Sequence, residues 1–220
     1  MKKQFGRRGT LAVRMLVVLF LGQVWTAWAA PEDEFRAGSQ AYQAGDVVQA
    51  MASLRKSADA GHAPSQSLLG YILDKAEFND EALAYYRKAA AQGDAEGEFG
   101  LGSMYAAGDG VKRDFAEARR WITRAAEKGH AGAINALATA HVNGGLGIVA
   151  AQRNDTETLR WVRRAADSGH LPAMEHLALA YRKGAYGLAV DVPQAQALEA
   201  KVRVARGLSE KGAAKKRERK

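Results

Sequence analysis

The sequence contains no cysteine among its 220 residues. This absence excludes disulfides, thiol catalysis, cysteine-ligated zinc and a lipid attached through an N-terminal cysteine. In an oxidising compartment the fold must therefore be stable through packing alone. A long hydrophobic run is also missing near the start of the chain. The apolar stretch 15–24 spans about ten residues, well below the ~20 that cross a bilayer as a helix.

Residues 1–29 have the composition of a cleaved export signal. Five basic residues and no acidic one accompany the apolar stretch, and Ala27-Trp28-Ala29 places small residues at both recognition positions of a cleavage site. We expect cleavage after Ala29 and a periplasmic or secreted protein with no stable membrane span, with an uncleaved membrane anchor as the alternative. The Arg7-Arg8 pair leaves Sec and twin-arginine export both open.

The positive charge is concentrated at the two ends of the chain. The formal net charge is +8, of which five charges lie in the leader and a net four in residues 210–220, so the segment between them is near −1. A nucleic-acid-binding domain carries a basic stripe on its folded body, so we expect no nucleic-acid partner. Residues 208–220 are predicted to be a disordered basic tail. Lys215, Lys216 and Arg217 are its candidate contacts to a partner.

A ten-residue pattern returns along the chain and ends on glycines that are 32, 36 and 40 residues apart. It is clearest in WITRAAEKGH (121–130) and WVRRAADSGH (161–170). Its apolar residues follow the i, i+3, i+4, i+7 spacing of one helix face, and the closing glycine suits the left-handed conformation that ends a helix. The recurring positions are Gly61, Gly93, Gly129, Gly169, Trp121, Trp161, Ala125, Ala126, Ala165 and Ala166.

A second helix repeats after each of these glycines, so that two kinds of helix alternate. No single pair could bury its apolar faces alone, and the pairs must stack. Self-similarity at this period predicts an all-α fold, a right-handed α-solenoid of about five stacked helix-turn-helix repeats over residues 31–207.

The connections inside two later pairs share one pattern. Tyr105 leads through Gly110 to Asp114, and Tyr181 leads through a similar loop to Asp191. Each Asp is predicted to cap the following helix by accepting hydrogen bonds from its first free N–H groups. Caps are also expected at Asp46 and at Asn79 or Asp80.

The pattern Leu-Gly-x-x-Tyr-x-x-Gly, Gly-Val-x-x-Asp, Ala-x-x-Trp, Ala-Ala-x-x-Gly resembles the Sel1-like repeat, a relative of the tetratricopeptide repeat. Residues 101–129 match it almost throughout, and the resemblance covers residues 35–207 in outline. It implies an adaptor or scaffold that binds other proteins. Exported bacterial members of the family take part in polysaccharide export, envelope signalling and motor assembly.

Neither a metal site nor an active site is expected. His62, His130 and His170 occupy one repeat position, and one repeat is too far for residues to share an ion at the ~2 Å ligand distance of zinc. His141 and His176 stand apart from them. No nucleophile with a base, no paired carboxylates and no phosphate-binding loop are recognisable. We therefore nominate no catalytic, cofactor-binding or metal-binding residue and predict that the protein is not an enzyme.

Two further positions repeat in register. Tyr85, Trp121 and Trp161 are expected in the core, since they continue the apolar face. The basic residues Lys56, Lys88, Arg124 and Arg164 are either solvated helix surface or a row that faces a ligand. The sequence thus predicts a non-enzymatic interaction module of the bacterial cell envelope that binds another envelope or secreted protein. The alternative is direct binding of an anionic polysaccharide through the basic row and tail.

Overall fold

The computed structural model describes residues 31–149 and 155–208. The expected signal peptide, its cleavage site and the basic tail from residue 209 lie outside these residues. The regular secondary structure of the described part is helical, and no β-sheet forms there, as the repeat pattern predicts. Residues 31–43 are helical, and the helices that follow are α2 (Val47–Asp59), α3 (Ala63–Lys75), α4 (Asn79–Ala91), α5 (Ala95–Ala107), α6 (Phe115–Glu127), α7 (Ala131–Asn143), α8 (Asp155–Asp167), α9 (Leu171–Lys183) and α10 (Val192–Ala205).

The chain divides into two compact units, residues 1–89 and 90–220, with the boundary inside α4. In the first unit α2 packs against α3. A Cβ atom at Gly70 of α3 would lie 3.0 Å from the ring of Tyr86. Tyr86 is buried, and the absence of a side chain at Gly70 lets its ring lie directly against the helix backbone. At Gly70, the small residue after the repeated leucine therefore allows two helices to pack closely.

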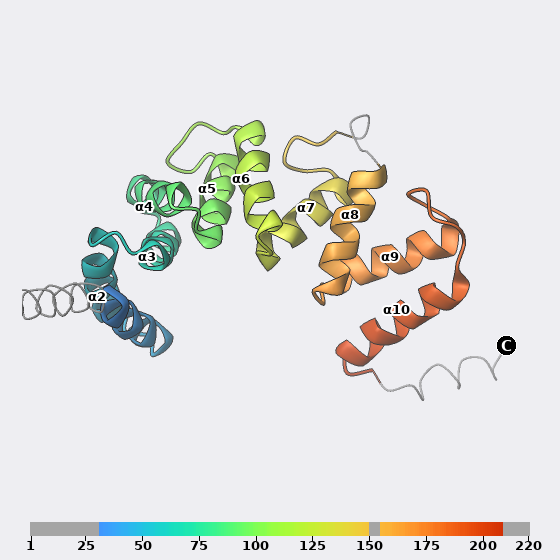
Figure 1. Ribbon diagram of the computed structural model, residues 1–220, viewed down its shortest axis with the longest axis horizontal. Helices are drawn as coiled ribbons and strands as arrows, with labels where there is room; N and C mark the ends of the chain where they lie inside the picture. The colour runs from blue at the N-terminus through green and yellow to red at the C-terminus, as the bar shows by residue number, and fades with distance from the viewer. Residues whose placement is uncertain (1–30, 150–154, 209–220) are drawn as a thin grey trace, which may run out of the picture. The chain divides into compact units, whose positions relative to one another are not determined.

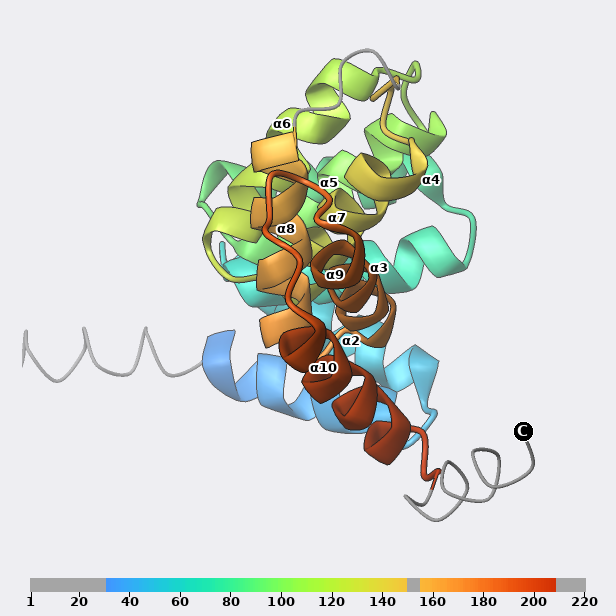
Figure 2. The same ribbon diagram turned by 90° about the vertical axis from the view of Figure 1, so that its right-hand side faces the viewer.

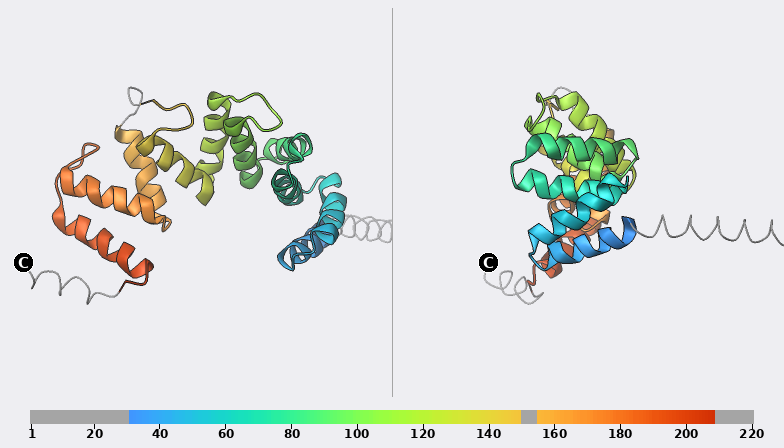
Figure 3. Two further views of the ribbon diagram at one scale, coloured as in Figure 1. Left: turned by 180° about the vertical axis from the view of Figure 1, so that it is seen from behind. Right: turned by 90° about the vertical axis from the view of Figure 1, so that its left-hand side faces the viewer.

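In the second unit each helix packs against the next, from α5 to α10 (Figure 1). The core cluster lies mainly on α6, α7, α8 and α9 and contains Ala125, Ala126, Ala165 and Ala166, as the repeat predicts. The last pair, α9 and α10, packs side by side (Figure 2). The loop between α5 and α6 and the loop that follows α7 lie at the same edge of this unit (Figure 3).

Helix ends follow the expected signals. The Asp114 carboxylate accepts hydrogen bonds from the N–H groups of Ala116 and Glu117 at 2.8 and 3.1 Å. Asp191 caps α10 in the same way, through the N–H of Gln194 at 3.0 Å. At the other end, Gly129 has a φ of +90° and open space where a Cβ would be, so it is needed for its conformation and not for room.

One cap was predicted wrongly. The helix α4 begins at Asn79, and the carbonyl of Phe78 accepts the first helical hydrogen bond, from Ala82 at 3.0 Å. Asn79 and Asp80 are thus inside the first turn instead of before it. Acidic residues there still stabilise the helix, because the first turn carries the positive end of the helix dipole.

The repeated aromatic position has two environments. Trp161 is 2% exposed and belongs to the core cluster, as expected. Trp121 is only partly buried, and its indole N–H donates to Glu117 at 3.1 Å. Tyr85 is also partly buried, while the next residue, Tyr86, is the buried ring of that helix. The prediction of a core aromatic at this register is confirmed for Trp161 and wrong for Tyr85 and Trp121.

Candidate functional site

The four basic residues that share a repeat position lie in the last turn of the second helix of each pair: Lys56 in α2, Lys88 in α4, Arg124 in α6 and Arg164 in α8. A cation at the C-terminal end of a helix is favoured by the partial negative charge there. This interaction with the helix end explains why a basic residue recurs at this position without any ligand.

Three members of this basic row have acidic partners within the chain. Lys56 lies 3.3 Å from Glu34, and Arg124 lies 2.8 Å from Glu98. Arg164 lies 3.1 Å from Glu127 and also donates to the carbonyl of Ala126 at 2.8 Å. The Nζ of Lys88 lies 4.9 Å from the centre of the Tyr85 ring. The row therefore ties helices together, and an anionic ligand would have to compete with these contacts.

Glu98 is the most buried member of these pairs. Its side chain is 0% exposed, and its Oε1 faces Arg124 Nη2 at 2.8 Å and Lys128 Nζ at 2.9 Å. Lys128 also donates to the carbonyl of Gly93 at 2.6 Å. Glu98 thus ties α5 to the C-terminal end of α6, and Lys128 also ties that end to the turn before α5. A buried charge is tolerated only when it is paired in this way.

Arginine side chains cover both repeated tryptophans. Arg120 and Arg124 each lie 4.7 Å from the centre of the Trp121 ring. On α8, Arg160 lies 4.6 Å and Arg164 lies 5.2 Å from the Trp161 ring. Arg160 is also hydrogen-bonded to Glu127, and this bond raises its pKa above the usual value. These cations stack on indole faces, so the tryptophans are not free platforms for a ligand.

Two histidines that precede first helices of pairs are fully engaged. His62 Nε2 lies 3.2 Å from Glu32, its Nδ1 lies 2.8 Å from the Ser65 hydroxyl, and its ring packs on Phe35. His130 repeats this arrangement. Its Nε2 lies 2.8 Å from Glu96, its ring centre lies 4.6 Å from that of Phe99, and its Nδ1 accepts from the backbone N–H of Ala133.

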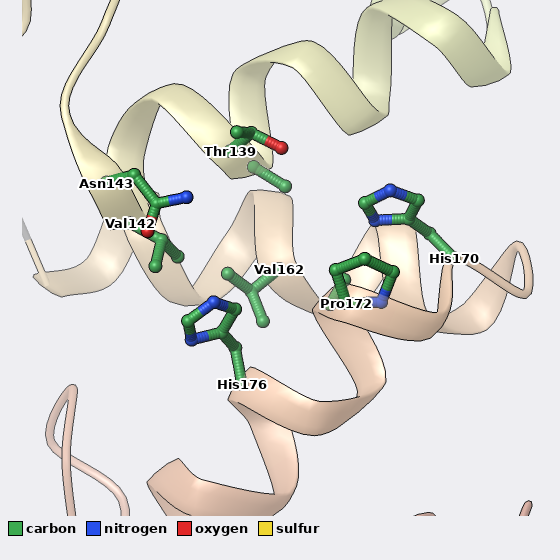
Figure 4. A pocket seen from close by; sticks show the side chains of 9 residues that line it. Thr139, Val142, Asn143, Val162, His170, Pro172 and His176 are labelled. Atoms are coloured by element: carbon green, nitrogen blue, oxygen red, sulfur yellow. The ribbon is translucent and has the colours of Figure 1, made fainter. Parts of the chain in front are cut away.

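The third histidine of this series lines a pocket between α7, α8 and α9. Figure 4 shows His170 and His176 on either side of Val162, with the Asn143 amide nearby. The pocket encloses about 250 Å³. We call it the α7–α9 pocket. Its lining residues are Ala138, Thr139, Val142, Asn143, Val162, His170, Pro172, Ala173 and His176.

The sequence did not single out this pocket. His170 and His176 were recognised there only as unsuitable for a shared metal ion. Within residues 31–149 and 155–208, no three His, Asp or Glu side chains converge on a possible metal position. In the same part of the chain, no helix is both long and apolar enough to span a bilayer. The signal that could have revealed the pocket is a comparison of first helices, where Glu96 and Phe99 of α5 are replaced in α7.

Comparison with known proteins identifies the class of this fold. The Sel1 repeat family matches residues 79–94, 95–130, 131–170 and 171–198, which together are more than half of the chain. The chain belongs to the Sel1 repeat family, and its stacked helix pairs form an all-α repeat solenoid. Proteins of this family are generally modules for protein–protein interaction.

Solved structures show the same fold. A Sel1 repeat protein from Oxalobacter formigenes has 27% sequence identity and a TM-score of 0.64, over 78% of this chain and 70% of that one. A protective antigen of uropathogenic Escherichia coli with an SLR fold has 25% identity and a TM-score of 0.51, over 82% and 47%. A sel1 repeat protein from Klebsiella pneumoniae subsp. pneumoniae shares the fold at 16% identity, with a TM-score of 0.55 over 81% and 89%.

Curated relatives share only part of the chain. DAP3-binding cell death enhancer 1 of Rattus norvegicus is 34% identical over 93 residues, which are 41% of this chain and 18% of that protein. The Mus musculus protein of the same name matches with the same figures. The chain therefore spans less than a fifth of the length of these relatives, which are named for binding another protein.

Proposed function

We propose that this protein is a non-enzymatic adaptor or scaffold of the bacterial cell envelope, which binds another envelope or secreted protein. The observation that carries the proposal is the stack of Sel1 repeats, because such solenoids present extended surfaces to partners. Export is proposed from residues 1–29, whose basic residues, short apolar stretch and Ala27-x-Ala29 site are typical of a cleaved signal. Exopolysaccharide export, envelope signalling and motor assembly are the roles that the family resemblance suggests.

The ion pairs favour a protein partner over an anionic polymer. A polymer that used the basic row would have to displace Glu34, Glu98 and Glu127 from their cations. The displacement of Glu98 would leave a carboxylate buried without a counter-charge, which is strongly unfavourable. Binding of a polymer would thus fall mainly to Lys88 and to Lys215, Lys216 and Arg217 of the tail.

Crosslinking in cells tests the proposal. The full chain is expressed with its own leader, crosslinked with a membrane-impermeant reagent, and the captured species are identified by mass. We expect one dominant envelope protein. Glycan-linked material whose yield falls steeply with salt would support the polymer instead. Capture of cytoplasmic proteins alone, or protection of the chain from the impermeant reagent, would refute the envelope assignment.

A further inference from the structure

In two repeats, the first helix supplies a carboxylate and an aromatic ring to the histidine that stands before the first helix of the next repeat. Among the helical residues 31–43, Glu32 and Phe35 are three positions apart, and both contact His62. In α5 the second residue is Glu96 and the fifth is Phe99, and these contact His130. The chain thus shows twice what this histidine position binds: a carboxylate at Nε2 and an aromatic ring against the imidazole.

The same positions in α7 are occupied by different residues. The second residue of α7 is Gly132 and the fifth is Asn135, so neither a carboxylate nor an aromatic ring is supplied to His170. Within residues 31–149 and 155–208, the Nδ1 of His170 is buried without a hydrogen-bond partner among the protein atoms. In native proteins such an atom is usually paired with water or another group.

The caps do not distinguish His170 from the whole series. His130 Nδ1 accepts a hydrogen bond from the backbone N–H of Ala133 and so caps α7. His170 makes no side-chain cap hydrogen bond before α9, and His62 makes none before α3. What distinguishes His170 among the three histidines is that no described residue provides it with a carboxylate.

The α7–α9 pocket next to His170 has the size and chemistry for the missing group. Its volume of about 250 Å³ is below the ~300–1,000 Å³ of pockets for drug-sized ligands, but it can admit one side chain. No acidic residue lines it, whereas His170, His176, the Asn143 amide and the Thr139 hydroxyl can all donate hydrogen bonds. A carboxylate is an acceptor for each of these groups.

We propose that the α7–α9 pocket binds the carboxylate of a Glu or Asp side chain on the partner protein. His170 Nε2 would contact this carboxylate as the Nε2 atoms of His62 and His130 contact their glutamates within the chain. As the ring reorients toward the carboxylate, its Nδ1 can accept from the N–H of Ala173, as His130 does from Ala133. This inference rests on the proposed function, since it requires a protein partner.

The pocket can be tested with the full chain and short peptides before any partner is known. Capped Ac-Ala-Glu-Ala-NH₂ is titrated while the side-chain nitrogen signals of all five histidines are followed by NMR. We expect saturable shifts at His170 and His176 at millimolar peptide, and little change at His62 and His130, whose carboxylates are already in place. Ac-Ala-Gln-Ala-NH₂ should bind at least about tenfold more weakly, because it offers no charged acceptor.

Variants separate the pocket from general effects on the fold. His170→Asn keeps an oxygen that can cap α9 but removes the imidazole, and it should abolish the shift at His176. Arg163→Asn, at an exposed position on α8 outside the pocket, is the matched control and should bind as the unaltered chain does. Equal binding of the Glu and Gln peptides, or equal shifts at His130 and His170, would overturn the proposal. If Ac-Ala-Ala-Ala with a free C-terminal carboxylate binds more tightly than the Glu peptide, the assignment of an acidic side chain is wrong and the ligand is a chain terminus.

The crosslinking experiment distinguishes this inference from the proposed function. If the unaltered chain captures a partner and His170→Asn captures it equally well, the pocket is not the contact although the adaptor function stands. If neither captures a protein but the Glu peptide still binds at His170, the adaptor function fails while the carboxylate site stands. Loss of capture with His170→Asn alone, and not with Arg163→Asn, supports both.

Discussion

The buried carboxylate of Glu98 offers a sharp test of the packing, because its removal and the removal of its counter-charges should have unequal effects. Glu98→Gln takes away the charge from a fully buried group, while Arg124 and Lys128, which are 49% and 40% exposed, can return to water. The contacts of Glu98 with these two cations are ion pairs without hydrogen-bond geometry, and the partial solvation of both cations limits what each pair contributes. We expect a loss of about 1–2 kcal/mol, because the carboxylate itself is buried.

Removal of the cations instead leaves the charge of Glu98 in place and takes away its counter-charges. Arg124→Met or Lys128→Met alone should cost about 1 kcal/mol, since the other cation remains on the same carboxylate oxygen. The double variant leaves the carboxylate buried without a partner and should cost about 3–5 kcal/mol, more than the sum of the single variants. Addition of Glu98→Met to the double variant should restore most of the stability, because no buried charge remains.

Urea unfolding followed by tryptophan fluorescence measures these changes, since Trp121 and Trp161 both lie in the second unit. The midpoints should shift at constant slope. The reasoning would be refuted if Glu98→Gln destabilised the protein more than the double cation variant. The carboxylate would then not be desolvated as the structure shows.

Three further changes probe the repeat itself. Ala125→Arg places a charge at a 0% exposed helix contact and should lower the free energy of unfolding by about 3–5 kcal/mol; an unaltered urea midpoint would contradict the helix register. Gly129→Ala should cost about 1 kcal/mol in the same assay through its φ of +90° alone, and no loss would mean that the turn conformation differs. Burial, followed by the charge of Asp59, raises the pKa of Tyr85 above 10.0 in the folded chain. The phenol proton of Tyr85 is therefore lost at a lower pH in the unfolded chain than in the folded one. Stability should therefore fall as the pH rises above 10 toward the folded pKa, and Tyr85→Phe should reduce that fall in alkaline thermal melts; an unchanged pH profile would exclude the tyrosine.

Local and periodic features of the fold could be predicted from the sequence. The Asp114 cap, the left-handed Gly129 and the buried Ala125 each follow from a single helix end or face, and the structure confirms them. The different burial of Trp121 and Trp161 could not be predicted, because the two residues occupy the same register. Their surroundings depend on neighbouring helices that a period in the sequence does not describe.

The candidate site was harder to predict for the same reason. The recurrence of basic residues was visible, but the partners of Arg124 and Arg164 come from Glu98 and Glu127, 26 and 37 positions earlier in the chain. The unsatisfied His170 is recognisable only once the contacts of His130 show which residues of the preceding first helix matter. Packing between repeats, and not the pattern within one repeat, determines which groups remain available to a partner.

Site-specific photo-crosslinking in cells tests whether this solenoid binds an envelope protein through the α7–α9 pocket, as we propose. A photoreactive residue replaces Thr139, which is exposed and lines the pocket, and in a second variant it replaces the exposed Arg163. We predict a single envelope-protein adduct from position 139 that is much stronger than any from position 163 and that is lost with His170→Asn. Equal adducts from both positions, or none from a folded and abundant chain, would show that the pocket does not bind an envelope protein.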